Sequence, residues 1–90
     1  MSEALEIVVD ATPNPHAMKF TLNRTVATTG ETYRGDPASV PAPWAKALLS
    51  VPGIVGVYGV NRFISVSKQP DAAWDDIVPQ AEVAIRRVFQ

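Results

Sequence analysis

Cysteine is absent from this 90-residue sequence, and its absence excludes several kinds of chemistry at once. Without thiols the chain forms no disulfide, offers no thiolate to a metal and has no cysteine nucleophile. Histidine is nearly absent as well. His16 is the single one, and its neighbours Pro15 and Ala17 carry no side-chain oxygen that could complete a metal site. The sequence therefore predicts no metal site and no cofactor.

An excess of charge of either sign is also missing. Eight basic and nine acidic residues give a formal net charge of −1, and Arg86 and Arg87 are the one adjacent basic pair. Proteins that bind nucleic acid normally carry a basic face, so we expect no nucleic-acid partner. No apolar run approaches the roughly 20 residues that span a membrane. The first ten residues, MSEALEIVVD, do not resemble a secretory signal, and we expect a cytoplasmic protein.

What the chain does have is enough apolar sequence for one small core. The hydrophobic fraction is 47%, and 90 residues lie at the small end of the usual domain range. We therefore treat residues 1–90 as a single domain.

The centre of this domain is predicted to be a β-hairpin between Val51 and Lys68. Ile54 to Tyr58 and Phe63 to Ser67 are rich in β-branched and aromatic residues, and the second run alternates apolar residues with serine. Gly59 and Asn61 lie between the runs, where residues that tolerate a left-handed backbone favour a tight turn.

Two further strands are predicted before the hairpin. Leu5 to Ala11 contains an apolar run that ends at the proline cluster Thr12-Pro13-Asn14-Pro15. In the next strand Met18, Phe20 and Leu22 alternate with Lys19 and Thr21, which places the apolar side chains on one face. A short turn between the two strands favours antiparallel pairing.

The stretch from Asn23 to Val40 is predicted to be irregular, with at most a short edge strand near Thr32 to Arg34. Its apolar signal fades into threonine, glycine, aspartate and serine. A loop of this length in a small domain is either mobile or involved in binding, and the sequence leaves both readings open.

Helical patterns flank the hairpin on both sides. Pro41 and Pro43 suit a first helical turn, Trp44 heads the apolar stripe that follows, and Pro52-Gly53 ends it. The second helix is predicted to begin near Asp71, which would cap it, and to run to Phe89.

Two details of the second helix are specific enough to check. Trp74 lies on its apolar stripe, which predicts a buried side chain, and Pro79 predicts a kink or a separate first turn. The fold class is thus α+β, a small and mostly antiparallel sheet of two N-terminal strands plus a hairpin with two helices packed on one face.

Two separated stretches of this sequence resemble a known family. TPNPHAMKF, from Thr12 to Phe20, and PWAKALLSVPGIVGVYGVNRFISVSK, from Pro43 to Lys68, are followed at similar spacing by Trp74. In this order they resemble the amino-terminal domain of the NifU-like iron-sulfur cluster scaffold proteins, the Nfu family. That family combines T-P-N-P-x-x-x-K-F, an S-P-L-A helix and a G-V-x-x-V hairpin that ends in F-I-T-V-T-K. The resemblance covers about Thr12 to Phe89.

The resemblance implies a role in iron-sulfur cluster assembly, as a stand-alone form of an accessory domain. The family holds its cluster in a different carboxyl-terminal domain with a C-x-x-C pair, whereas this sequence contains no cysteine. The implied partners are iron-sulfur scaffold or client proteins, with the chain itself a monomer or a weak homodimer. Trp44 replaces the family's leucine, and Gly59-Val60-Asn61-Arg62 replaces a more acidic hairpin tip, so an acidic contact at that tip is not carried over.

The proline-braced turn is the candidate binding site. A stiff turn loses little entropy when it binds a partner, although its prolines are also explained by shaping the chain reversal alone. Lys19 is predicted to lie opposite the apolar face, free to meet a carboxylate of a partner. The candidate partner-binding residues are Thr12, Pro13, Asn14, Pro15, His16 and Lys19.

No catalytic residue is predicted. Asp75 and Asp76 diverge by about 100° around a helix and do not converge on one proton. No phosphate loop or nucleophile turn accompanies the serines and threonines. Two alternatives to a protein-binding domain remain. A small-molecule binder would have a deep pocket beside the turn, and a structural homo-oligomer would join through an exposed sheet edge.

Overall fold

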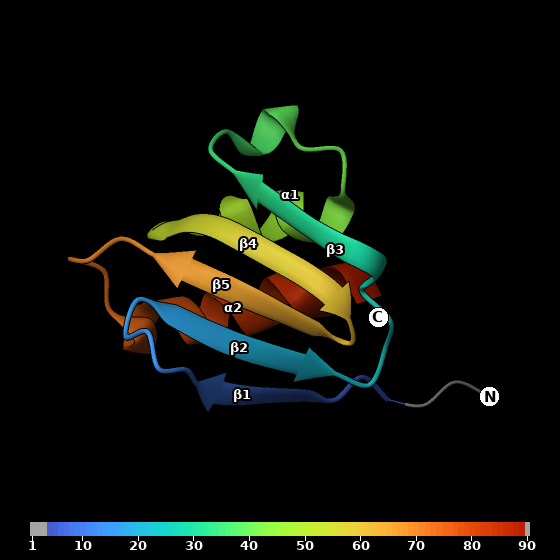
Figure 1. The fold of residues 1–90 in the computed structure, drawn as a ribbon. Helices are drawn as coiled ribbons and strands as arrows, with labels where there is room; N and C mark the ends of the chain where they lie inside the picture. The colour runs from blue at the N-terminus through green and yellow to red at the C-terminus, as the bar shows by residue number, and fades with distance from the viewer. Residues whose placement is uncertain (1–3, 90) are drawn as a thin grey trace.

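The computed structural model describes residues 4–89, which form one antiparallel sheet with two α-helices packed on one of its faces (Figure 1). The predicted fold class is therefore confirmed. The sheet has five strands in the order β1-β2-β5-β4-β3. The elements are β1 (Ile7–Ala11), β2 (Ala17–Leu22), β3 (Ala27–Arg34), the 3-10 helix η1 (Pro37–Ser39), α1 (Pro43–Leu49), β4 (Ile54–Asn61), β5 (Phe63–Lys68) and α2 (Trp74–Phe89).

The predicted hairpin, β4 and β5, occupies the middle of the sheet. β2 pairs with β5 on one side and β3 pairs with β4 on the other, all antiparallel. β1 and β2 also pair antiparallel, as their short connection predicts. Asn61 makes the hairpin reversal with a φ of 53°, a left-handed conformation that asparagine tolerates better than most residues.

Gly59 has a different role from the predicted one. It lies within β4, opposite Ile64, and it does not adopt a positive φ. A Cβ atom at this position would lie 2.6 Å from Cη2 of Trp44, far inside van der Waals contact. Gly59 is therefore required by the close approach of α1 to the sheet and not by the turn.

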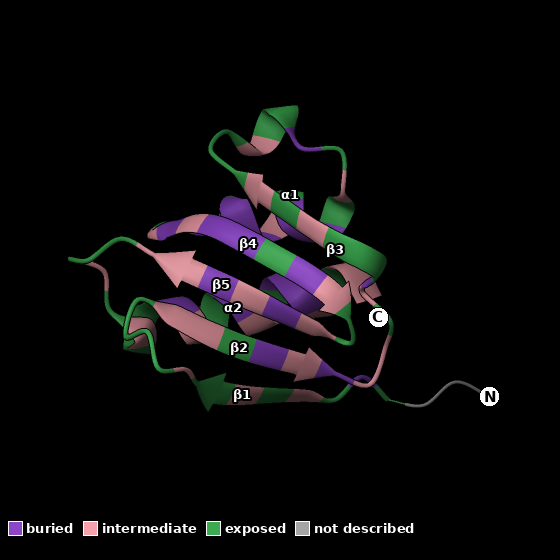
Figure 2. Cartoon of the chain, viewed as in Figure 1, coloured by how far each residue is buried: buried purple, intermediate pink, exposed green. Residues whose placement is uncertain are grey.

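The core fills the space between the sheet and the two helices (Figure 2). Trp44 is only 5% exposed, as its place at the head of the apolar stripe predicts. Its ring meets the ring of Tyr33 from β3 edge to face, with the centroids 5.9 Å apart. The largest fully buried side chains are Phe20, Leu48, Ile64, Val66, Ile77 and Ile85.

The edge strand expected near Thr32 to Arg34 is present, but it is longer than predicted, so much of the stretch from Asn23 to Val40 is not irregular. β3 is an eight-residue edge strand, and η1 follows it, with Asp36 capping the free amide of Ala38 at 2.9 Å. The sequence underestimates the length of β3 because an edge strand is stabilised by backbone pairing with its neighbour, and most of its side chains are exposed and polar.

The second helix also begins later than predicted. α2 starts at Trp74, and the carbonyl of Ala73 accepts the first backbone bonds, from Asp76 and Ile77. Asp71 lies in the preceding turn and does not cap it. Pro79 lies inside the continuous helix, so the predicted separate first turn is absent. α1 likewise begins at Pro43, with Pro41 outside it.

The contact between Gly59 and Trp44 makes a first prediction. Gly59→Ala should lower the free energy of unfolding by about 1–3 kcal/mol, because the added methyl group overpacks a rigid indole ring. Denaturant titration measures the loss.

The control is the same change in a Trp44→Leu background, which removes the obstructing ring. Gly59→Ala should cost clearly less there, and equal losses in both backgrounds would show that the ring is not the obstacle.

Candidate functional site

The turn between β1 and β2 is tied together by its own side chains. The Thr12 hydroxyl accepts the Asn14 N–H at 3.2 Å and lies within hydrogen-bond distance of the carbonyl oxygens of Asn14, at 2.9 Å, and Ala17, at 3.0 Å. Oδ1 of Asn14 accepts the His16 N–H at 2.9 Å, and the Ala17 N–H closes the turn on the Asn14 carbonyl at 3.0 Å. Short polar side chains stabilise turns in this way.

Two distant elements hold this turn against the rest of the molecule. The N–H of Lys68, at the end of β5, donates to the carbonyl of His16 at 2.9 Å. Nε1 of Trp74, the first residue of α2, donates to the carbonyl of Pro15 at 3.0 Å. Trp74 is half-buried, which corrects its predicted full burial, and its ring also lies 5.8 Å from Nζ of Lys68.

The candidate residues of the turn are therefore fixed in place but open to solvent. Pro13, Asn14, Pro15 and His16 are exposed, and Thr12 is partly buried. The sequence predicts the stiffness of this turn from its prolines, but it carries no signal for the anchoring by Trp74, which is 59 residues away from Pro15.

Lys19 lies on the face of the sheet that the helices leave uncovered. Its side chain is exposed, and its neighbours across the ladder are Asp10 on β1 and Ser65 on β5. Nζ of Lys19 lies 4.7 Å from the ring centroid of Phe63, a cation–π contact that restrains the ammonium group.

The same uncovered face carries apolar side chains. By the strand register Val8 shares a face with Thr21 and Phe63, and Tyr58 shares it with Lys19. Val8 is 55% exposed and Tyr58 is 39% exposed. The candidate site therefore combines a fixed turn, a lysine and a partly apolar sheet surface, a composition suited to contact with a protein.

A separate polar contact lies on the edge strand β3. The Tyr33 hydroxyl donates to Oε1 of Glu31 at 3.0 Å. This hydrogen bond, with a smaller contribution from desolvation and from the Glu31 charge, raises the pKa of Tyr33 above its ordinary value of 10.0. No residue of the turn takes part in this contact.

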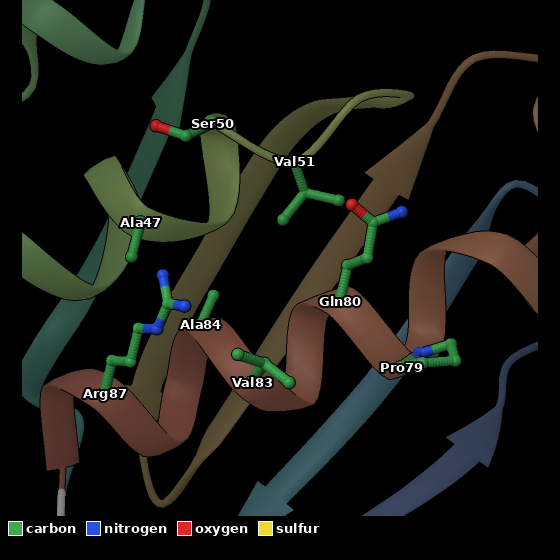
Figure 3. A pocket seen from close by; sticks show the side chains of 8 residues that line it. All are labelled: Ala47, Ser50, Val51, Pro79, Gln80, Val83, Ala84 and Arg87. Carbon is green, nitrogen blue, oxygen red and sulfur yellow. The ribbon is translucent and has the colours of Figure 1, made fainter.

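The two cavities we describe lie on the helix side of the molecule. One of about 390 Å³ lies between α1 and α2 (Figure 3), and one of about 340 Å³ lies where the β5–α2 connection meets the start of α2. Neither is lined by a residue of the turn, so neither supplies the pocket that a small-molecule site beside the turn requires.

Within residues 4–89, no group of three or more histidine, aspartate or glutamate side chains gathers in a way that could hold a metal ion. Neither described helix is both long enough and apolar enough to cross a bilayer.

Comparison with known proteins gives a consistent result. A family model described as "Scaffold protein Nfu/NifU N terminal" matches residues 7–90. The crystal structure of protein SAV1430 from Staphylococcus aureus is similar, with a TM-score of 0.76 and 34% identity, over 88% of this chain and 96% of that chain.

Longer curated proteins match over the same region. The NFU1 iron-sulfur cluster scaffold homolog, mitochondrial, of Drosophila sechellia is 38% identical over 81 residues, which are 87% of this chain and 28% of that protein. Conserved virulence factor C of Staphylococcus aureus is 34% identical over 84% of this chain and 20% of its own length. The chain thus spans between a fifth and a third of the length of these curated relatives.

The anchoring of the turn makes a second prediction. Trp74→Phe keeps an aromatic ring but removes the donor to Pro15, and it should lower the free energy of unfolding by about 0.5–1.5 kcal/mol. Amide hydrogen exchange should become faster at Lys68 and Ala17, whose N–H groups bond within or to the turn.

The matched control is Trp44→Phe, because the Trp44 ring lies under β4 and away from the turn. It should cost stability through lost packing without selectively exposing those two amides. Unchanged exchange at Lys68 and Ala17 in Trp74→Phe would mean that the indole N–H does not hold the turn.

Proposed function

This chain belongs to the Nfu/NifU N-terminal scaffold family, and from that membership we propose that it is a non-enzymatic, protein-binding accessory domain of iron-sulfur cluster assembly. The proposal rests on the family match over residues 7–90, together with relatives that are named iron-sulfur cluster scaffold homologs. These 90 residues contain no cysteine, so they contribute protein contacts, and any thiolate ligands to the cluster come from outside them.

The partner contacts this chain at the turn and at the adjoining uncovered sheet face. Hydrogen bonds from β5 and α2 hold the carbonyls of His16 and Pro15 before any partner arrives. Binding there orders little backbone, which lowers the entropic cost of association. The exposed groups of Asn14 and His16 provide directional hydrogen bonds to the partner.

Lys19 sets the charge that this surface recognises. Its ammonium group is exposed but restrained over Phe63, so it meets a carboxylate of a scaffold or client protein at reduced entropic cost. The exposed ring of Tyr58 and side chain of Val8 add apolar area around this charge.

A crosslinked pull-down from native lysate tests this proposal. Lys19→Glu should reduce recovery of iron-sulfur scaffold or client proteins about tenfold or more, because it opposes like charges across the interface. Quantitative mass spectrometry of the crosslinked partners, against the wild-type chain, measures the change.

Lys46→Glu is the matched control, because Lys46 is an exposed lysine on α1, in the helix layer. This variant should recover the same partners as the wild type. Repeated failure of the wild-type chain to recover any iron-sulfur assembly or client protein would contradict the function. Equal recovery by Lys19→Glu and wild type would remove Lys19 from the interface.

A further inference from the structure

Four exposed residues form a stripe along the solvent side of α2. Asp76, Gln80, Val83 and Arg87 follow one another at spacings of four, three and four residues, and all are exposed. At about 100° per residue these positions fall within a narrow arc of the helix. The stripe begins with an acid, ends with a base and has an apolar residue near its middle.

This stripe borders a furrow on the surface of the helix layer. The cavity of about 390 Å³ is lined by Gln80, Val83 and Arg87 of α2 and by Ala47 and Ser50 on the side of α1. Figure 3 shows the side chain of Arg87 extending from α2 toward Ala47 on α1, and that of Gln80 extending toward Val51, just after α1. The cavity of about 340 Å³ shares Gln80 and adds Asp71 and Asp76, so the furrow continues toward the acidic end of the helix.

The ends of the stripe have no charged partner in residues 4–89. Neither the Asp76 carboxylate nor the Arg87 guanidinium forms an ion pair with another described residue, and Val83 is 49% exposed. The side-chain amide of Gln80 donates to the backbone carbonyl of Asp76, and it does not bond the Asp76 carboxylate. The furrow therefore presents an apolar centre between the Asp76 carboxylate and the Arg87 guanidinium, and Asp71 adds a second negative charge at the acidic end.

We propose that this furrow is the contact between two copies of the chain, with their α2 helices antiparallel across a two-fold axis. Such an axis, placed midway between Gln80 and Val83, brings Asp76 of each copy opposite Arg87 of the other. It also brings each Val83 opposite Gln80 of the other copy, at the entrance to the furrow. Arg87 lies eleven positions after Asp76, about 16 Å along the helix. The antiparallel copy has the same separation in the opposite direction.

The charge pattern favours a second copy over an unrelated helix. A single stripe supplies both kinds of charge, so the two-fold arrangement pairs Asp76 and Arg87 of both copies with no other sequence required. Val83 is the one large apolar side chain of the stripe, and the contact is accordingly small and weak. It lies in the helix layer, whereas the proposed partner surface lies on the uncovered sheet face, so the two contacts are independent.

Sedimentation equilibrium of charge-swap variants tests this inference. The wild-type chain should associate between about 10 µM and about 1 mM, the range expected for a small interface. Asp76→Arg and Arg87→Asp should each weaken self-association roughly tenfold or more, because each variant places like charges opposite one another twice. A one-to-one mixture of the two variants, and the double variant D76R/R87D, should both associate as the wild type does.

Two controls keep the outcome clear. Lys19→Glu changes a charge on the sheet face and should leave the association unchanged. Val83→Lys replaces the exposed apolar residue near the middle of the stripe and leaves the charges at both ends of α2 in place. It should therefore abolish association without the risk that a swapped end charge destabilises the helix. A wild-type chain that remains monomeric at about 1 mM would overturn the proposal. So would single swaps without effect, or a mixture and a double variant that fail to associate.

Discussion

The approach of Trp44 to Gly59 is the contact on which the joining of the two layers depends. Trp44 lies at the start of α1, and the missing side chain at Gly59 lets the indole ring reach the backbone of β4. The ring of Tyr33, from edge strand β3, packs edge to face against the same indole. One side chain thus connects a helix, a central strand and an edge strand, and a larger residue at position 59 would disturb all three.

The sequence predicts the parts of the fold that have strong periodicity. The alternation of β2 and β5 and the apolar stripe of α2 identify those elements, and the short connections fix their antiparallel pairing. The prediction finds only the end of β3, near Thr32 to Arg34, because the stability of an edge strand comes from a neighbour that is distant in sequence. It also fails for Gly59, since a glycine in a strand and a glycine in a turn look identical until the partner side chain is known.

The candidate site shows the same division between local and distant causes. Pro13 and Pro15 limit the backbone conformations of the turn, and this limit can be read from the sequence. Its position relative to the sheet comes from Lys68 and from the indole N–H of Trp74, neither of which is near the turn in the chain. Trp74, predicted to be buried on the apolar stripe of the second helix, therefore acts instead as a half-buried brace for a surface turn.

The two proposed surfaces lie on opposite layers of a thin molecule, and this separation has a consequence for binding. The sheet face with Lys19 and the furrow beside Val83 are divided by a single core layer, so occupation of one leaves the other open. Two copies joined through their α2 helices would present two turns and two lysines to a partner. A partner with two matching sites would then bind the pair more tightly than either copy alone, because the second contact forms at a high effective concentration. Weak self-association thus becomes a means of strengthening partner binding without enlarging either interface.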